Sequence, residues 1–253
     1  VILVEDKAAG RVASSVSLVE QTWCYEGIPL HVGEVGIVST RPEYRHRGLV
    51  RAQFDVYHRL ARRAGCLLSV ISGIPYFYRQ YGYEYIVATG GGARLFYEQI
   101  PPLAEGQPTL YQVRRGTPQD WPQVLALYRV SVQEACLSAM MEEPIWQHQH
   151  SLPDACGDLK ETYLLEREGQ PCGFIRINAN ERGWDKGVVI SAAYLPTQAM
   201  CLAALQFART LAEGRQERTV TVGLPLPMPL VQLAHDLGGE PRRGYAWQIR
   251  VLD

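Results

Sequence analysis

The residues of this chain that are best suited to chemistry form a short basic turn. Arg45, Arg47 and Arg51 surround Gly48, just before a run in which apolar residues recur every three or four positions. A turn that opens a helix leaves several backbone N–H groups unpaired, with the positive end of the helix dipole behind them. Guanidinium groups add full charges and forked donors, and a glycine allows a ligand to approach the backbone closely. The pattern therefore predicts a phosphate-binding turn.

A strand and an amphipathic helix must position this turn. Residues 31–40 have the β-branched, apolar content of a buried strand, which Arg41-Pro42 ends. Residues 48–64 follow as a helix with one apolar face. A short strand over residues 67–72 and a short helix over residues 76–81 come next. The expected order is therefore strand, phosphate turn, helix, strand and short helix.

This turn resembles a known motif. Arg45-x-x-Gly48-x-Val50 is similar to the pyrophosphate loop of the GCN5-related N-acetyltransferase (GNAT) superfamily, where Gly or Ala often stands in place of Val50. Residues 47–52 are similar to the variant of this loop in the enhanced-intracellular-survival type of tandem acetyltransferase. The alternative interpretation is a basic helix start on the protein surface.

The resemblance implies that the chain binds acetyl-coenzyme A (acetyl-CoA) and needs no metal. Backbone groups of the strand would pair with the pantetheine arm as an added strand, and one N–H group would polarise the thioester carbonyl. Ordinary sheet pairing is the alternative use of these groups. The residues that the resemblance assigns to the cofactor are Ile37, Val38, Ser39, Arg45, His46, Arg47, Gly48, Leu49, Val50, Arg51 and Ser72.

A second motif follows the helix. Residues 77–83, Phe-Tyr-Arg-Gln-Tyr-Gly-Tyr, resemble the superfamily segment in which the Tyr four positions before Gly protonates the leaving thiolate. This resemblance implies that Tyr78 is the general acid, with Tyr76 as the reserve candidate. Because the segment is rich in tyrosine, packing aromatics are the alternative interpretation.

The acceptor amine must lose a proton before it can attack the thioester, so a base is needed. Glu34, at the start of the cofactor strand, is the first candidate by position. His31 is the second candidate and has a more convenient intrinsic pKa. The alternative for both residues is an ordinary polar side chain near a strand end.

The two halves of the chain share an order of predicted elements, which indicates an internal repeat. We expect an α/β (α+β) protein with two tandem GNAT-like domains, each a mixed, mostly antiparallel twisted sheet flanked by helices. Residues 1–99 would be an N-terminal domain without its first elements, residues 100–109 a linker, and residues 110–253 a degenerate second domain. Residues 195–199, Leu-Pro-Thr-Gln-Ala, lack the Arg-x-x-Gly pattern, so the second copy is not expected to bind coenzyme A.

The bulk composition limits the class of protein. With 253 residues, 47% hydrophobic content and a net charge of −1, the chain can form a full core, and neither disorder nor nucleic-acid binding is favoured. Its six cysteines lack metal-ligand spacing and favour a reducing, cytoplasmic setting. No apolar run approaches the ~20 residues of a membrane span.

These features together predict an N-acetyltransferase that moves an acetyl group from acetyl-CoA to a primary amine by direct attack. Neither motif contains a Cys that could form an acyl-enzyme. The acceptor would be a small molecule or a peptide, and the chain could form a homo-oligomer. The alternatives are a catalytically silent CoA-binding or regulatory module and a protein-interaction scaffold without a ligand.

Overall fold

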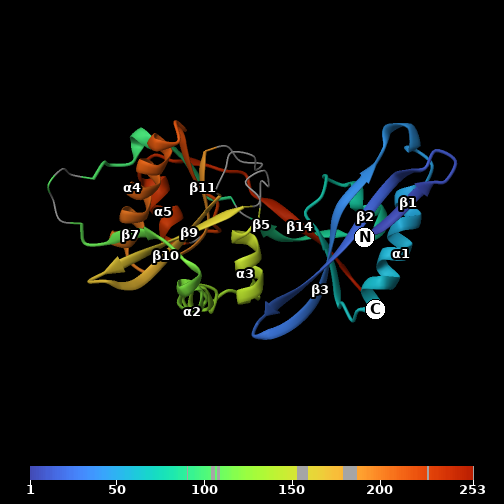
Figure 1. Ribbon diagram of the computed structural model, residues 1–253, viewed down its shortest axis with the longest axis horizontal. Helices are drawn as coiled ribbons and strands as arrows, with labels where there is room; N and C mark the ends of the chain where they lie inside the picture. Colours follow the sequence, from blue (N-terminus) through green and yellow to red (C-terminus); the bar gives the residue numbers. More distant parts are fainter. Residues whose placement is uncertain are drawn as a thin grey trace. The chain divides into compact units, whose positions relative to one another are not determined.

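The chain forms two compact units in its computed structural model, which describes residues 1–89, 91–103, 106, 109–152, 159–178, 187–226 and 228–252 (Figure 1). The first unit comprises Val1–Thr89, Ala135–Met140 and Tyr245–Asp253, and the second comprises Gly90–Glu134 and Met141–Gly244. Within the described residues, no helix has the length and apolar character needed to cross a membrane.

The first unit is a mixed sheet with one long helix against it. Its elements are β1 (Ile2–Asp6), β2 (Arg11–Tyr25), β3 (Ile28–Thr40), α1 (Leu49–Arg63), β4 (Leu68–Ile71), β5 (Glu84–Thr89), β8 (Leu137–Ala139) and β14 (Tyr245–Val251), with 3₁₀ turns at Pro42–Tyr44 and Phe77–Tyr81. The strands lie in the order β1-β2-β3-β4-β14-β5, and β8 pairs with β2. All of these pairs are antiparallel except β3–β4.

The second unit has a sheet of the same kind. Its elements are β6 (Ala93–Phe96), β7 (Gln112–Arg115), α2 (Trp121–Ser131), α3 (Glu143–His150), β9 (Lys160–Arg167), β10 (Gln170–Asn178), β11 (Val188–Tyr194), α4 (Gln198–Gly214), β12 (Thr219–Val222), α5 (Pro229–Asp236) and β13 (Glu240–Pro241), with 3₁₀ turns at Tyr97–Gln99 and Pro118–Asp120. The strand order is β13-β6-β12-β11-β10-β9-β7, with β11–β12 parallel. Two mixed sheets flanked by helices confirm the predicted fold class.

The cores explain why these sequences fold as they do. The apolar face of α1 packs Phe54, Tyr57 and Ala61 against residues of β2, β3 and β4, as its 3.6-residue period predicts. In the second unit, helices cover both faces of the sheet. One cluster of buried residues includes α4 and α5, and a separate cluster includes α2 and α3.

The two units differ from the division predicted from the sequence. β6, which was expected to close the first half, pairs with β12 in the second sheet, and β14, expected in the second half, lies between β4 and β5. In Figure 1 the red strand β14 crosses among the strands of the first unit. Local sequence patterns indicate where a strand forms, but they do not specify which strands it pairs with in a sheet. The predicted linker, residues 100–109, lies inside the second unit, and residues 104, 105, 107 and 108 fall outside the described part.

A buried chain of hydroxyl groups fixes α1 against the parallel pair β3–β4. Tyr57 donates to the carbonyl of Gly33 at 2.8 Å, and Ser69 donates to Tyr57 at 3.1 Å. Ser69 also contacts the Tyr83 hydroxyl at 2.5 Å, and that hydroxyl lies 3.0 Å from His58 Nε2. Burial lowers the pKa of His58 to about 4, so this imidazole is neutral near pH 7.

Candidate active site

A β-bulge interrupts β3 in the predicted cofactor strand. Ser15 pairs with Ser39 and Ser17 with Gly36, so β3 uses one more residue than β2 between these points. Ile37 is the extra residue. Its φ of 48° is in the left-handed region, and its side chain is 76% exposed. The bulge therefore redirects backbone groups of β3 that would otherwise continue the ladder.

After Glu34, just before the bulge, β3 and β4 part. Their described residues pair only from Val32 with Leu68 to Glu34 with Val70, while β3 continues to Thr40. The edge of β3 that faces β4 is thus left without a ladder partner over its last residues. An extended ligand with amide groups can add to such an edge as a strand.

The turn after β3 has the geometry of an anion site. Gly48 is the N-cap of α1 with φ 73°, and no side chain caps the helix. The first bond within the helix runs from the N–H of Ala52 to the carbonyl of Gly48 at 3.1 Å, so the N–H groups of residues 49–51 precede it. The first turn contains no acidic residue. These donors and the helix dipole favour a phosphate group.

The three predicted arginines line this turn and bond to neutral acceptors. Arg47 donates to the carbonyl of Glu43 at 3.0 Å, and Arg45 donates weakly to that of Thr40 at 3.4 Å. Arg51 donates to Gln80 Oε1 at 3.1 Å. In the described part of the chain, none of the three arginines forms an ion pair with a carboxylate. Their charges are therefore available to an anionic ligand. His46, with φ 62°, is exposed beside them.

Tyr78 lies in the 3₁₀ turn Phe77–Tyr81, which Arg51 links to α1. Its side chain is 4% exposed and packs on Phe54, with ring centroids 5.9 Å apart. A Cβ at Gly73 would lie 2.0 Å from Tyr78 Cε2, so only glycine fits there. Within the described part of the chain, the Tyr78 hydroxyl has no hydrogen-bond partner. Burial raises the pKa of Tyr78, which keeps the phenol protonated.

The reserve candidate, Tyr76, has a different setting. Its side chain is 68% exposed, its φ is 63°, and its N–H donates to the Tyr85 hydroxyl at 2.9 Å. Ser72, the predicted strand-end contact, is exposed directly after β4. Of the two candidates, Tyr78 is therefore the one held in place by packing, against Gly73 and Phe54 of α1.

Glu34 sits at the last β3–β4 pair, where the two strands begin to separate. Gln21 donates to its carboxylate, and Trp23 Nε1 donates to Gln21 Oε1 at 3.0 Å. Burial raises the pKa of Glu34, although the Gln21 hydrogen bond opposes this rise. Nε2 of His31, the second candidate base, instead lies 3.2 Å from Glu20 Oε2. A carboxylate with a raised pKa at the opening of the strands is suited to accept a proton.

Two residues beside this site were missed from the sequence because they come from β14. Tyr245 donates to the carbonyl of Gly73, and Gln248 Nε2 donates to the same carbonyl at 3.3 Å. They fix the backbone against which Tyr78 packs. No local pattern could have identified them, since β14 lies more than 150 residues further along the chain.

The corresponding turn of the second unit is closed. α4 follows the parallel strand β11 as α1 follows β3, but its N-cap Thr197 accepts a hydrogen bond from the N–H of Met200 at 3.2 Å. The side chain of Thr197 thus occupies a donor that a phosphate would need. Among described residues, no group of three or more His, Cys, Asp or Glu could hold a metal ion.

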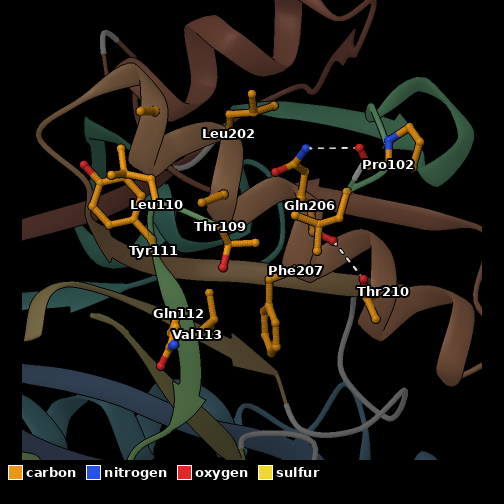
Figure 2. A pocket seen from close by; sticks show the side chains of 13 residues that line it. Pro102, Thr109, Leu110, Tyr111, Gln112, Val113, Leu202, Gln206, Phe207 and Thr210 are labelled. Carbon is orange, nitrogen blue, oxygen red and sulfur yellow. Dashed lines mark hydrogen bonds between the residues drawn. The ribbon is translucent and has the colours of Figure 1, made fainter. Parts of the chain in front are cut away.

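A cavity of about 710 Å³ lies in the second unit, between α4 and residues 102–103 and 109–113 (Figure 2). Its wall is largely apolar and includes Leu202 and Phe207, while Gln206 donates to the carbonyl of Pro102 at 3.3 Å. It contains none of the residues predicted to bind the cofactor or to act in catalysis.

Comparison with known proteins agrees with this geometry. Residues 1–86 match the family model described as an acetyltransferase (GNAT) domain. A GCN5-related N-acetyltransferase from Anabaena variabilis superposes with a TM-score of 0.72 at 17% identity, over 97% of this chain and 61% of that one. The chain has the GNAT fold. The resemblance inferred from the two motifs is thereby confirmed.

Two further structures share this fold. Eis1 from Mycobacterium abscessus has a TM-score of 0.61 at 14% identity, over 99% of this chain and 63% of that one. N-Myristoyltransferase from Saccharomyces cerevisiae, solved with bound myristoyl-CoA, has a TM-score of 0.65 at 12% identity, over 96% of this chain and 68% of that one. The chain spans about six-tenths of the Anabaena and Mycobacterium structures. No curated protein matched the sequence significantly.

Proposed function

We propose that the first unit is an acyl-CoA-dependent N-acyltransferase that moves an acetyl group from acetyl-CoA to a primary amine. The observation that carries this proposal is the uncapped, arginine-lined start of α1 placed directly after the bulged and half-open strand β3. The GNAT-domain match over residues 1–86 supports it independently. In the structural relative from yeast, the bound acyl-CoA indicates the class of donor that this fold accepts.

In this proposal the turn binds the cofactor pyrophosphate through the N–H groups of residues 49–51 and through the arginines around Gly48. The open edge of β3, including Val38 and Ser39, pairs with the pantetheine amides. A backbone N–H at the Ile37 bulge polarises the thioester carbonyl. The cofactor therefore lies between the separating ends of β3 and β4.

The reaction follows from the two side chains at this opening. Glu34 takes a proton from the acceptor amine, whose nitrogen forms a bond to the acetyl carbon. The C–S bond then breaks, and Tyr78 gives its proton to the leaving thiolate. The products are an amide and free coenzyme A, and no acyl-enzyme forms. The second unit is a degenerate copy, because Thr197 caps the helix that would bind the second cofactor.

The test measures cofactor binding and turnover separately on the full chain. Calorimetry with acetyl-CoA reports binding, and release of free thiol with a panel of small amines and peptides reports transfer. Binding together with amine-dependent thiol release supports the proposal. Binding without release would instead indicate the catalytically silent CoA-binding module, and an absence of binding would overturn both. Longer acyl-CoA thioesters in the same assay identify the preferred acyl group.

A matched pair of glycine variants localises the cofactor. Gly48→Glu places a negative charge at the turn, and we expect about 100-fold weaker acetyl-CoA binding, which corresponds to ~2.7 kcal/mol. Gly10→Glu adds the same charge at a glycine with a similar φ of 60° and open surroundings in the β1–β2 turn. Equal losses in the two variants would contradict the assignment of the turn.

A further inference from the structure

A buried arginine in the second unit has no acidic partner among the residues that the structure describes. Arg176, on β10, is 6% exposed, and burial lowers its pKa only to about 10, so it is charged near pH 7. Its Nη2 donates to Gln149 Oε1 at 2.8 Å, and its Cζ lies 4.1 Å from the centre of the Trp146 ring. Its Nε is buried without a hydrogen-bond partner, as is Nε1 of Trp146.

The carboxylates on the adjacent strand β9 and in the turn before α2 are already paired. Glu161 is on the adjacent strand β9, but it contacts Arg115 at 2.9 Å and Arg215 at 2.6 Å. Glu166, further along β9, and Asp120 both bind Arg114 at 2.7 Å. Among the residues described, therefore, no carboxylate neutralises Arg176.

An isolated buried charge is costly, and a buried N–H without an acceptor adds to the cost. The cation–π contact with Trp146 and one amide acceptor offset only part of it. Two unpaired donors and one uncompensated charge in a single cluster indicate that an acceptor bearing negative charge belongs there. We infer that the second unit binds a small monocarboxylate ligand at Arg176.

The surroundings favour a monocarboxylate over phosphate. His150 is kept neutral by burial, which lowers its pKa, and it bonds to the Trp146 carbonyl at 2.7 Å and to Thr162 at 2.8 Å. Arg115, the other cation that acts on His150, is paired with Glu161. Arg176 is therefore the one cation described in this cluster without a carboxylate, and a dianion would leave a buried negative charge in excess. The aromatic rings of Trp121 and Trp146 are suited to the apolar body of an organic acid. A guanidinium group also matches the two oxygens of a carboxylate.

This site is independent of the proposed acyl transfer, so its test contains no acyl-CoA. The full chain is melted in sodium acetate, sodium benzoate, sodium phosphate or sodium chloride at equal ionic strength, and benzoate binding is measured by Trp fluorescence. We expect a saturable rise in Tm with the carboxylates that exceeds the rise with chloride or phosphate. The absence of a saturable carboxylate effect, or an equal effect of all four salts, overturns the proposal.

Two variants separate a ligand site from a structural arginine. Arg176→Met removes the uncompensated charge, so its Tm in chloride should exceed that of the wild type, and benzoate binding should weaken at least 100-fold. Gln149→Glu supplies an internal carboxylate to the same guanidinium and should likewise raise Tm and abolish the benzoate response. If Arg176→Met does not fold, the Tm and benzoate response of Gln149→Glu still test the proposal.

The control is Arg129→Met on the exposed side of α2, which should keep the wild-type Tm and benzoate response. If Arg176 were purely structural, Arg176→Met would lower Tm equally in every salt, and Gln149→Glu would leave the response to carboxylates unchanged. Either result would refute the site.

Discussion

At the scale of single residues, Tyr78 combines a buried ring with a hydroxyl that bonds to no described residue. Tyr78→Phe keeps the ring contacts with Phe54 and Gly73 but removes the proposed proton donor. We expect kcat to fall by ~10²–10⁴-fold, with acetyl-CoA binding and thermal stability nearly unchanged. Steady-state kinetics and calorimetry measure the two effects.

The control for this prediction is Tyr81→Phe in the same 3₁₀ turn. The Tyr81 ring stacks on Phe54 at 4.3 Å, so this variant makes the same chemical change in the same aromatic cluster. A wild-type rate for Tyr78→Phe, or an equal loss in both variants, would remove Tyr78 from the reaction.

Glu34 links activity to stability through its raised pKa. Burial makes protonated Glu34 favourable in the folded state, so ionisation of this carboxyl opposes folding. Relative to Glu34→Gln, the wild type should therefore lose stability as pH rises from the ordinary carboxyl pKa through the higher folded one. The same ionisation generates the base, so kcat/KM of the wild type should rise with pH over this interval.

Glu34→Gln should lose the rising limb of the pH–rate profile and about 100-fold in kcat/KM at neutral pH. Glu20→Gln, which removes an exposed carboxylate of the adjacent strand, should keep both the limb and the rate. Denaturant unfolding at several pH values checks the stability difference. If the pH–rate profile of Glu34→Gln matched that of the wild type, Glu34 would not be the base and another group would have to accept the proton.

At the scale of elements, the bulge of β3 imposes strain on a β-branched residue. Ile37 has a positive φ that L-residues rarely adopt, and its exposed side chain adds little packing to offset this. Ile37→Gly should therefore stabilise the protein by about 1 kcal/mol, even though glycine in a strand costs entropy. Acetyl-CoA binding should be retained, because the backbone N–H groups remain.

Val19→Gly on the adjacent strand provides the matched comparison, since Val19 is also β-branched and exposed. There the backbone is regular, so the same change should destabilise the protein by about 1 kcal/mol. Denaturant unfolding of both variants decides the point. If both were destabilised, Ile37 would not be strained.

The elements also mark how far sequence reasoning reaches. The helix predicted at residues 48–64 is observed at Leu49–Arg63, because its period and its flanking glycines are local signals. The turn at Gly48 was predicted for the same reason. The bulge at Ile37 and the hydrogen bonds of Gln248 were not predicted, because they depend on register and on strands distant in sequence. Residues 143–150, which have little periodicity, form α3.

At the scale of the whole molecule, β14 completes the sheet that holds the site. It pairs with β4 on one side and β5 on the other. Removal of residues 245–253 should leave β5 without a partner and expose the core around Tyr78. We expect the truncated chain to lose acetyl-CoA binding and the cooperative unfolding of its first unit. Hydrogen exchange measures the unfolding, and the amides of the second unit should keep their protection from exchange.

Removal of residues 1–6 is the control, because β1 lies at the edge of the first sheet and, among the described strands, pairs with β2 alone. This deletion should weaken the first unit without abolishing acetyl-CoA binding. A chain without residues 245–253 that still bound the cofactor would show that β14 is dispensable to the site.

The insertion of β14 also fixes an order of events during protein synthesis. All of the second unit leaves the ribosome after β5 and before β14. During synthesis, the sheet of the first unit therefore lacks its strand between β4 and β5 until the second unit has been translated. A chain interrupted at any point in that interval carries every proposed catalytic residue and yet lacks the strand that closes their sheet.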